Sequence, residues 1–119
     1  MTAHDDHTLD LRHLRQTIGG DPEFERLLLG EYLDQSEAIL ARLADAVCTR
    51  NAGAIRSAAH ELKGSSRTIG AARVADAAQM LETIGTSGEL GAVEHAHAAL
   101  RHAYDRLRIA IHEHVRKAA

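Results

Sequence analysis

One short stretch of the chain combines residue types that could carry out group transfer. His60-Glu61-Leu62-Lys63-Gly64-Ser65-Ser66 places a histidine, a lysine and a glycine at separations of three and four residues. Residues so spaced are neighbours on a helix surface. A neutral imidazole is a nucleophile, and a nearby ammonium group stabilises an anion bound to it. A glycine inside a helix costs about 1 kcal/mol relative to alanine, so its position beside His60 suggests that space is needed there. Together these features suggest a histidine that accepts a phosphoryl group.

The helix that would carry this stretch has two distinct faces. Spacing at about 100° per residue gathers its apolar positions on a core face, which consists of Ile55, Ala59, Leu62, Ser66 and Ile69. A second stripe, here called the basic stripe, consists of Arg56, His60, Lys63, Gly64 and Arg67. We expect the basic stripe to face solvent. Its cations disfavour the protonated imidazole and would stabilise an attached phosphoryl group.

The rest of the chain predicts further helices to position this one. Aromatic residues make up 3% of the sequence and there is one proline, a composition that favours helices over strands. Apolar periodicity and caps predict helices over residues 9–18, 22–47, 52–69, 72–84 and 90–116, with Gly70 as a helix stop and a loop over residues 85–88.

These elements predict an all-α fold, an up-down-up-down antiparallel four-helix bundle with an additional short N-terminal helix. Residues 1–7 are polar and are expected to form a flexible N-terminal segment, and residues 8–119 to form a single domain.

Composition argues against several classes of protein. The formal net charge is −3, so no overall charge attracts nucleic acid or anionic lipid. No apolar run is long enough to span a membrane, and no signal peptide is apparent, which makes a cytoplasmic location the expectation. A single cysteine, Cys48, excludes an internal disulfide, and its place beside an apolar helix position predicts burial.

The chain also contains histidine pairs that could be mistaken for metal ligands. His95 and His97, like His112 and His114, are two residues apart and diverge on a helix. We therefore expect surface histidines and no metal site. The sequence also lacks a glycine-rich nucleotide loop, so no autonomous ATP-dependent kinase activity is expected.

The motif around His60 resembles the signature of histidine-containing phosphotransfer (HPt) domains, including the following Ile69-Gly70. These domains are helical bundles of about this size. The resemblance implies that His60 accepts phosphoryl from a receiver-domain aspartyl-phosphate through Nε2 and passes it to another receiver. It further implies that Lys63 stabilises the phosphoryl group, that Gly64 gives the receiver clearance, and that the receiver supplies Mg²⁺. No cofactor bound by this chain is expected.

One position differs from a common pattern of the family. Several members carry a glutamine on the following helix that hydrogen-bonds the histidine, and Glu82 stands at that position here. In an antiparallel hairpin turning near Gly70, residue 60 lies level with about residue 82, so the carboxylate could accept the Nδ1 proton of His60 and fix its tautomer. Gln79, one turn earlier, is an alternative partner. The sequence leaves open whether the carboxylate or the cations dominate at the imidazole.

The helix over residues 22–47 has a second apolar stripe that includes Phe24, Leu28 and Tyr32. Packing against the short first helix is one explanation for Phe24 and Leu28. The other is a surface on which a receiver docks.

The resulting hypothesis is a phosphocarrier of a multistep two-component phosphorelay that forms a phosphohistidine intermediate, is monomeric, and binds receivers of response regulators or hybrid sensor kinases. The alternative is a helical adaptor that binds a receiver or kinase domain without accepting phosphate. Whether the carrier counts as an enzyme is left open.

Overall fold

Five α-helices and one 3₁₀ turn make up the computed structural model, which describes residues 8–118. The elements are α1 (Leu11–Ile18), α2 (Pro22–Cys48), α3 (Ala52–Thr68), α4 (Ala72–Ser87), the 3₁₀ turn η2 (Leu90–Ala92) and α5 (Val93–Ala118). The segment predicted to be flexible, residues 1–7, lies outside the described residues.

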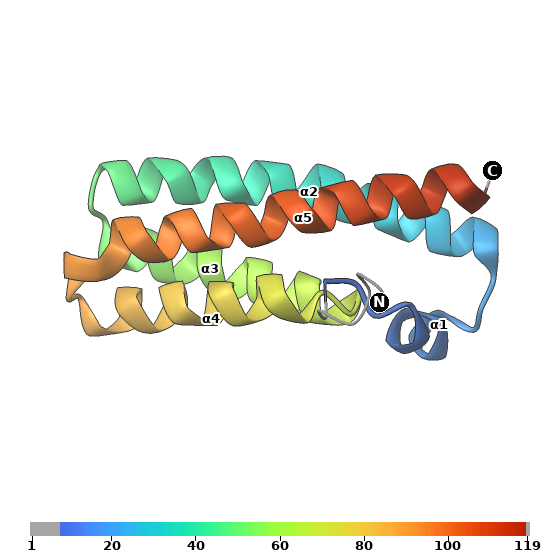
Figure 1. Ribbon diagram of the computed structural model, residues 1–119. Coiled ribbons are helices and arrows are strands. Elements are labelled where there is room, and N and C mark those ends of the chain that lie inside the picture. Colours follow the sequence, from blue (N-terminus) through green and yellow to red (C-terminus); the bar gives the residue numbers. More distant parts are fainter. Residues whose placement is uncertain (1–7, 119) are drawn as a thin grey trace.

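The four long helices form an antiparallel bundle, which confirms the predicted fold. α2 and α5 lie side by side, α3 and α4 form the other pair, and α1 lies across the end where α2 begins (Figure 1). The core is built mainly from leucine, isoleucine, valine and alanine, and fully buried residues such as Leu29, Leu62, Leu81 and Leu100 come from each of the four long helices. Burial of this apolar surface is the main force that holds the helices together.

Local sequence signals set the helix starts. The side chain of Asp21 accepts hydrogen bonds from the backbone N–H groups of Glu23 and Phe24, with Pro22 in the first turn. Asn51 caps α3 in the same way through the N–H of Ala54. Such caps satisfy backbone donors that have no partner within the helix. The N-cap at Asn51 fixes where α3 begins and therefore the register of His60 along the bundle.

Two expectations about the ends of helices are wrong. Residues 85–87 belong to α4 rather than to a loop, and the helix ends at Gly88, whose φ of 75° is left-handed. Cys48 is exposed rather than buried, because it is the last residue of α2 and lies past the end of the core.

A close contact between α3 and α4 explains why residue 85 is a glycine. A Cβ atom at Gly85 would lie 2.7 Å from the backbone N of Arg56 and 2.8 Å from the carbonyl O of Ala52. Only glycine permits this approach, since real Cβ contacts are never so short. The contact brings the last turns of α4 against the first turns of α3, one turn from the residues that surround His60.

Candidate functional site

His60 lies in the middle of α3 with its ring open to solvent. Its side chain is 69% exposed, while Ala59 and Leu62 on either side of it in the sequence are fully buried. The amphipathic pattern of α3 therefore directs the ring outward while the helix itself is fixed in the core. An exposed imidazole on a rigid helix is accessible to the active site of another protein.

Glu82 of α4 orients the ring. Its Oε2 lies 2.9 Å from Nδ1 of His60, so the hydrogen bond expected from the antiparallel register is present. A carboxylate oxygen only accepts, and Nδ1 must therefore carry the proton. In the neutral ring this leaves the lone pair on Nε2, the nitrogen that is not bound by the protein.

Lys63 is not on the open stripe that the sequence predicted. Its side chain is only 14% exposed, with Nζ 2.6 Å from Oε1 of Glu82 and 3.0 Å from Oε1 of Gln79. The helical projection placed Lys63 beside His60 correctly, but α4 packs against this side of α3 and covers it. The ammonium group is thus held next to His60 by two residues of the neighbouring helix.

Gln79 supports Lys63 rather than His60. Its side-chain oxygen Oε1 accepts a hydrogen bond from Nζ of Lys63, and its Nε2 donates to Oγ1 of Thr83 at 3.1 Å. Among the described contacts the partner of His60 is therefore Glu82, not the alternative, Gln79. Gln79 and Glu82 both lie on the face of α4 that meets α3, one helical turn apart.

Glu82 carries negative charge at this site. The hydrogen bond from Lys63 is the largest influence, and together with the hydrogen bond from His60 it lowers the pKa of Glu82 below its usual 4.5 against an opposing effect of desolvation. The carboxylate is therefore ionised at neutral pH and bridges an imidazole and an ammonium group.

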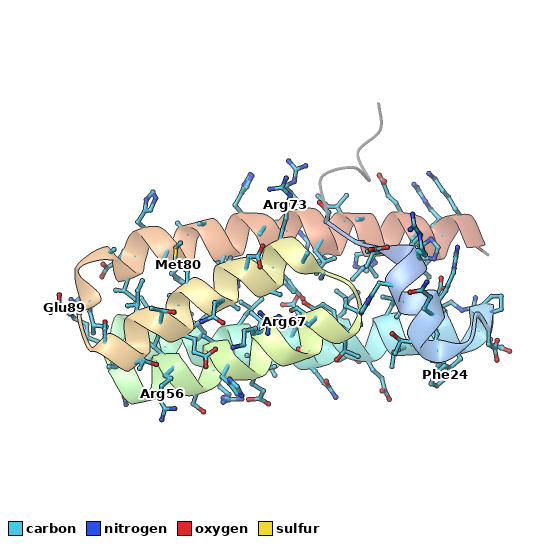
Figure 2. All side chains as sticks on the ribbon, turned by 90° about the horizontal axis from the view of Figure 1, so that it is seen from below. Phe24, Arg56, Arg67, Arg73, Met80 and Glu89 are labelled. Carbon is cyan, nitrogen blue, oxygen red and sulfur yellow. The ribbon has the colours of Figure 1, made fainter. Side chains whose placement is uncertain are left out.

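Gly64 leaves open space next to the ring. A Cβ atom at this position would meet no atom within 4 Å. The two arginines of the basic stripe are exposed, Arg56 near the start of α3 and Arg67 near its end, and the side chain of Arg56 points away from the bundle (Figure 2). The site therefore has free approach along α3, with positive charge at both ends of the path.

A shallow groove lies beside this path, between α2 and α3. Its volume is about 270 Å³, and it is lined by Leu28, Glu31, Tyr32, Gln35, Ser65, Thr68 and Ile69. Phe24, at the start of α2, is 47% exposed. Leu28 is half-buried against the core and also lines the groove.

Tyr32 differs from the other two apolar residues of that stripe. It is 4% exposed, and its hydroxyl shares a 2.8 Å hydrogen bond with Oγ of Ser66 on α3. Burial raises the pKa of Tyr32, so the phenol stays neutral. A side chain this deeply buried cannot offer much surface to a partner; instead it ties α2 to the helix that carries His60.

Sequence reasoning missed a second ionic cluster, at the end of the bundle where α2 begins and α5 ends. Glu25 of α2 is 5% exposed and binds Nε2 of His114 on α5 and Nε of Arg15 on α1, the latter at 3.0 Å. We call these three residues the clasp. His114, and also His97, are half-buried rather than surface histidines as expected. A signal was present, since Glu25 falls one turn before the core residue Leu29 on the apolar seam of α2.

Within residues 8–118, no group of three or more His, Cys, Asp or Glu side chains is arranged to hold a metal ion. No helix in this range has the length and apolar character required to cross a membrane.

Comparison with known proteins agrees with the geometry. A family model for the Hpt domain matches residues 27–110. The structure is similar to the crystal structure of histidine-containing phosphotransfer protein B (HptB) from Pseudomonas aeruginosa PAO1, with 26% sequence identity and a TM-score of 0.86 over 92% of this chain and 96% of that chain. No curated protein sequence is significantly similar to the chain. Because the family model covers most of the sequence, the chain belongs to the Hpt-domain family.

Proposed function

We propose that this protein is a histidine phosphotransfer protein of a multistep phosphorelay, which accepts a phosphoryl group on His60 from a receiver-domain aspartyl-phosphate and returns it to a second receiver. The observation that carries the proposal is the His60 ring itself, 69% exposed and hydrogen-bonded through Nδ1 so that Nε2 is free. Membership of the Hpt family supports the same role.

The reaction needs few protein groups. Nε2 attacks the phosphorus of the acyl phosphate in line, the P–N bond forms, and the P–O bond to the aspartate breaks with its electron pair leaving on the carboxylate. Positioning and electrostatic stabilisation provide most of the catalysis in phosphoryl transfer. Here Glu82 would orient the ring and Lys63 would stabilise the phosphoryl oxygens. Family members carry no cofactor of their own, and we expect the Mg²⁺ to come from the receiver.

The receiver is expected to dock over α3 and the neighbouring surface of α2. Gly64 provides clearance beside the ring, and the groove lined by Leu28 and Thr68 runs next to it. Phe24 is exposed close to the same surface. Aromatic side chains such as that of Phe24 are enriched in protein–protein interfaces. One carrier monomer would suffice, because all of these residues come from one chain.

The test is transfer from a receiver domain phosphorylated with acetyl phosphate. We expect acid-labile, base-stable label on the wild-type protein and none on the variant His60→Gln. A matched control is His13→Gln, which changes an exposed histidine of α1. Equal labelling of wild type and His60→Gln would refute the proposal, and binding of the receiver without any label on wild type would favour the non-catalytic adaptor instead.

A further inference from the structure

We propose that a groove between α2 and α5 is the contact surface of a reversible two-fold dimer, in which the α2 helices of two copies of this chain cross at Gly30. The proposal does not depend on the function proposed for His60. It rests on three features of the outer face of α2: a glycine that the fold does not require, an exposed leucine near it, and charges that become complementary when two copies of this face meet.

The groove lies on the side of the bundle away from His60. Its volume is about 590 Å³. It is lined by Arg108 of α5 and by residues of α2 that include Arg26, Leu27, Gly30 and Asp34. α2 and α5 form one pair of neighbouring helices, whereas His60 lies where the other pair, α3 and α4, meets (Figure 1). A second copy bound in the groove would therefore leave the His60 ring of each copy open.

The fold itself does not require a glycine at position 30. Gly30 is an interior residue of α2, and a Cβ atom there would meet no atom of the described part of the chain within 4 Å. At Gly85, by contrast, a Cβ atom would lie 2.7 Å from the α3 backbone. Glycine is unfavourable inside a helix, so its presence at an open position needs another reason. The missing side chain allows a second helix to approach closely from outside, since the side chains at a crossing set the distance between helix axes.

Leucine side chains lie on both sides of Gly30 along the helix. Leu27, three residues before it, is 64% exposed. Leu33, three residues after it, is half-buried against the core and lines the groove. A two-fold axis at Gly30 exchanges positions that are equally far before and after it, so Leu27 of each copy meets Leu33 of the other. Burial of this apolar surface favours pairing.

The charges on this face are complementary under the same two-fold axis. Arg26 lies four residues before Gly30 and Asp34 four residues after it, and both are exposed. Each copy therefore places Arg26 opposite Asp34 of the other, which gives two ion pairs in one dimer. Within the chain Arg26 contacts Glu23 at 3.9 Å, with side chains 46% and 79% exposed. Such an exposed ion pair is weak and does not hold Arg26 away from a partner.

One pair of like charges also faces this surface. Glu37 lines the groove and accepts a hydrogen bond from the hydroxyl of Tyr104 at 3.2 Å. Its counterpart across the axis is Glu23, and each lies seven residues, or two helical turns, from Gly30. Helices that cross at an angle diverge away from the crossing, so these carboxylates lie farther apart than the opposite charges one turn from it. Arg108 of α5 also adds positive charge to the groove.

The surface suits a weak pair that forms and separates readily. It presents one well-exposed leucine rather than a continuous apolar face, so we expect the interface to bury less than the roughly 1,200 Å² of stable complexes. A dissociation constant on the order of 0.1 mM is then expected. Below that concentration the protein is a monomer, which agrees with a candidate site built from one chain.

Sedimentation velocity of the full chain from about 10 µM to about 1 mM tests the proposal. We expect the average mass of wild type to rise with concentration towards twice that of the monomer. Arg26→Glu and Asp34→Arg should each pair about tenfold more weakly, because like charges then face each other twice. An equimolar mixture of these two variants should recover pairing, since each supplies the charge that the other needs. Asp45→Arg, which reverses an exposed aspartate of α2 outside the groove, should pair like wild type.

A change at Gly30 separates pairing from folding. Gly30→Gln should raise the melting temperature, because glutamine favours helix and has open space at this position, but should abolish pairing, because the added side chain keeps the helices apart. Circular dichroism checks that each variant is folded. A wild type that stays monomeric at about 1 mM, a mass that rises beyond that of a dimer, or a mixture that fails to recover pairing would each overturn the proposal. Undiminished pairing of Gly30→Gln would do the same, and none of these results bears on phosphoryl transfer to His60.

Discussion

Two clusters in this protein contain the same three kinds of group, a glutamate, a histidine and a longer basic side chain. At the candidate site these are Glu82, His60 and Lys63, and in the clasp they are Glu25, His114 and Arg15. The exposure of the histidines separates the two: the side chain of His60 is 69% exposed and that of His114 is 20% exposed. The same kinds of group are therefore open to solvent at His60 and enclosed within the bundle at the clasp.

The ring nitrogen that each glutamate binds differs as well. Glu82 binds Nδ1, which leaves Nε2, the nitrogen farther from the backbone, free to react. Glu25 binds Nε2, so the outer nitrogen of His114 is occupied and faces the protein. The two carboxylate–histidine pairs therefore differ in the ring nitrogen left free and in the space around the ring, and not in the residue types present.

The most direct way to break the comparison is to remove each histidine in turn. We expect His60→Gln to lose labelling by a phosphorylated receiver completely, because the nucleophile is gone, while His114→Gln keeps it. Labelling of both proteins, measured after the stability of each is checked by circular dichroism, separates the two roles. Loss of labelling in a well-folded His114→Gln protein would show that the clasp takes part in the chemistry.

For the stability of the fold, we expect the carboxylate of the clasp to matter more than the carboxylate of the candidate site. Glu25→Gln is expected to lower the free energy of unfolding by about 2 kcal/mol, since it removes a buried charge and leaves His114, whose side chain is 20% exposed, without its charged partner. Glu82→Gln should lower it less, because its partner His60 is 69% exposed and water can replace the lost hydrogen bond to the ring. Urea denaturation measures both, with Glu23→Gln as a control whose side chain is 79% exposed on the same helix as Glu25. A larger loss for Glu82→Gln than for Glu25→Gln would reverse the assignment.

We expect low pH to reduce the stability of the fold mainly by protonating Glu25 of the clasp. Burial tends to raise the pKa of Glu25, but the hydrogen bonds from His114 and Arg15 outweigh it and hold this pKa below the usual 4.5. A carboxyl whose folded pKa is depressed contributes stability above its unfolded pKa, and loses that contribution as pH falls through the folded value. We therefore expect the urea midpoint of wild type to fall below pH 4.5 more steeply than that of Glu25→Gln.

The matched comparison for this pH effect is Glu82→Gln: the pKa of Glu82 is also lowered, but its partner His60 is 69% exposed, so solvent screens that interaction. Its acid limb should stay close to that of wild type. Parallel acid limbs for wild type and Glu25→Gln would mean that the clasp contributes nothing to folding in this pH range.

The sequence predicted the candidate site better than the clasp for a physical reason. His60 and Gly64 are one turn apart on one helix, so helical spacing alone puts them together, and the antiparallel turn near Gly70 brings Glu82 level with them. The burial of Lys63 escaped prediction because a projection of one helix says nothing of the helix that covers it.

The clasp joins residues from three helices that meet only when the bundle closes. Glu25 and His114 are 89 positions apart in the sequence. Helical periodicity carries no information about such a pairing. Likewise the close approach of the α3 backbone to Gly85, where a side chain would not fit, is a tertiary contact that the pattern along one helix does not reveal.

The smallest effect expected concerns the space that Gly64 leaves beside His60. Gly64→Ala should raise the free energy of unfolding by up to about 1 kcal/mol, because a methyl group at this exposed helical position meets no atom within 4 Å and alanine favours helix. The same methyl group would intrude on a receiver that closes over His60, so transfer from a receiver should slow. Labelling by phosphoramidate should not, because a small donor needs no such clearance. Equal slowing with both donors would mean that Gly64 affects the orientation of the His60 ring rather than the access of a receiver to it. The open surface around His60 would then no longer distinguish the candidate site from the clasp.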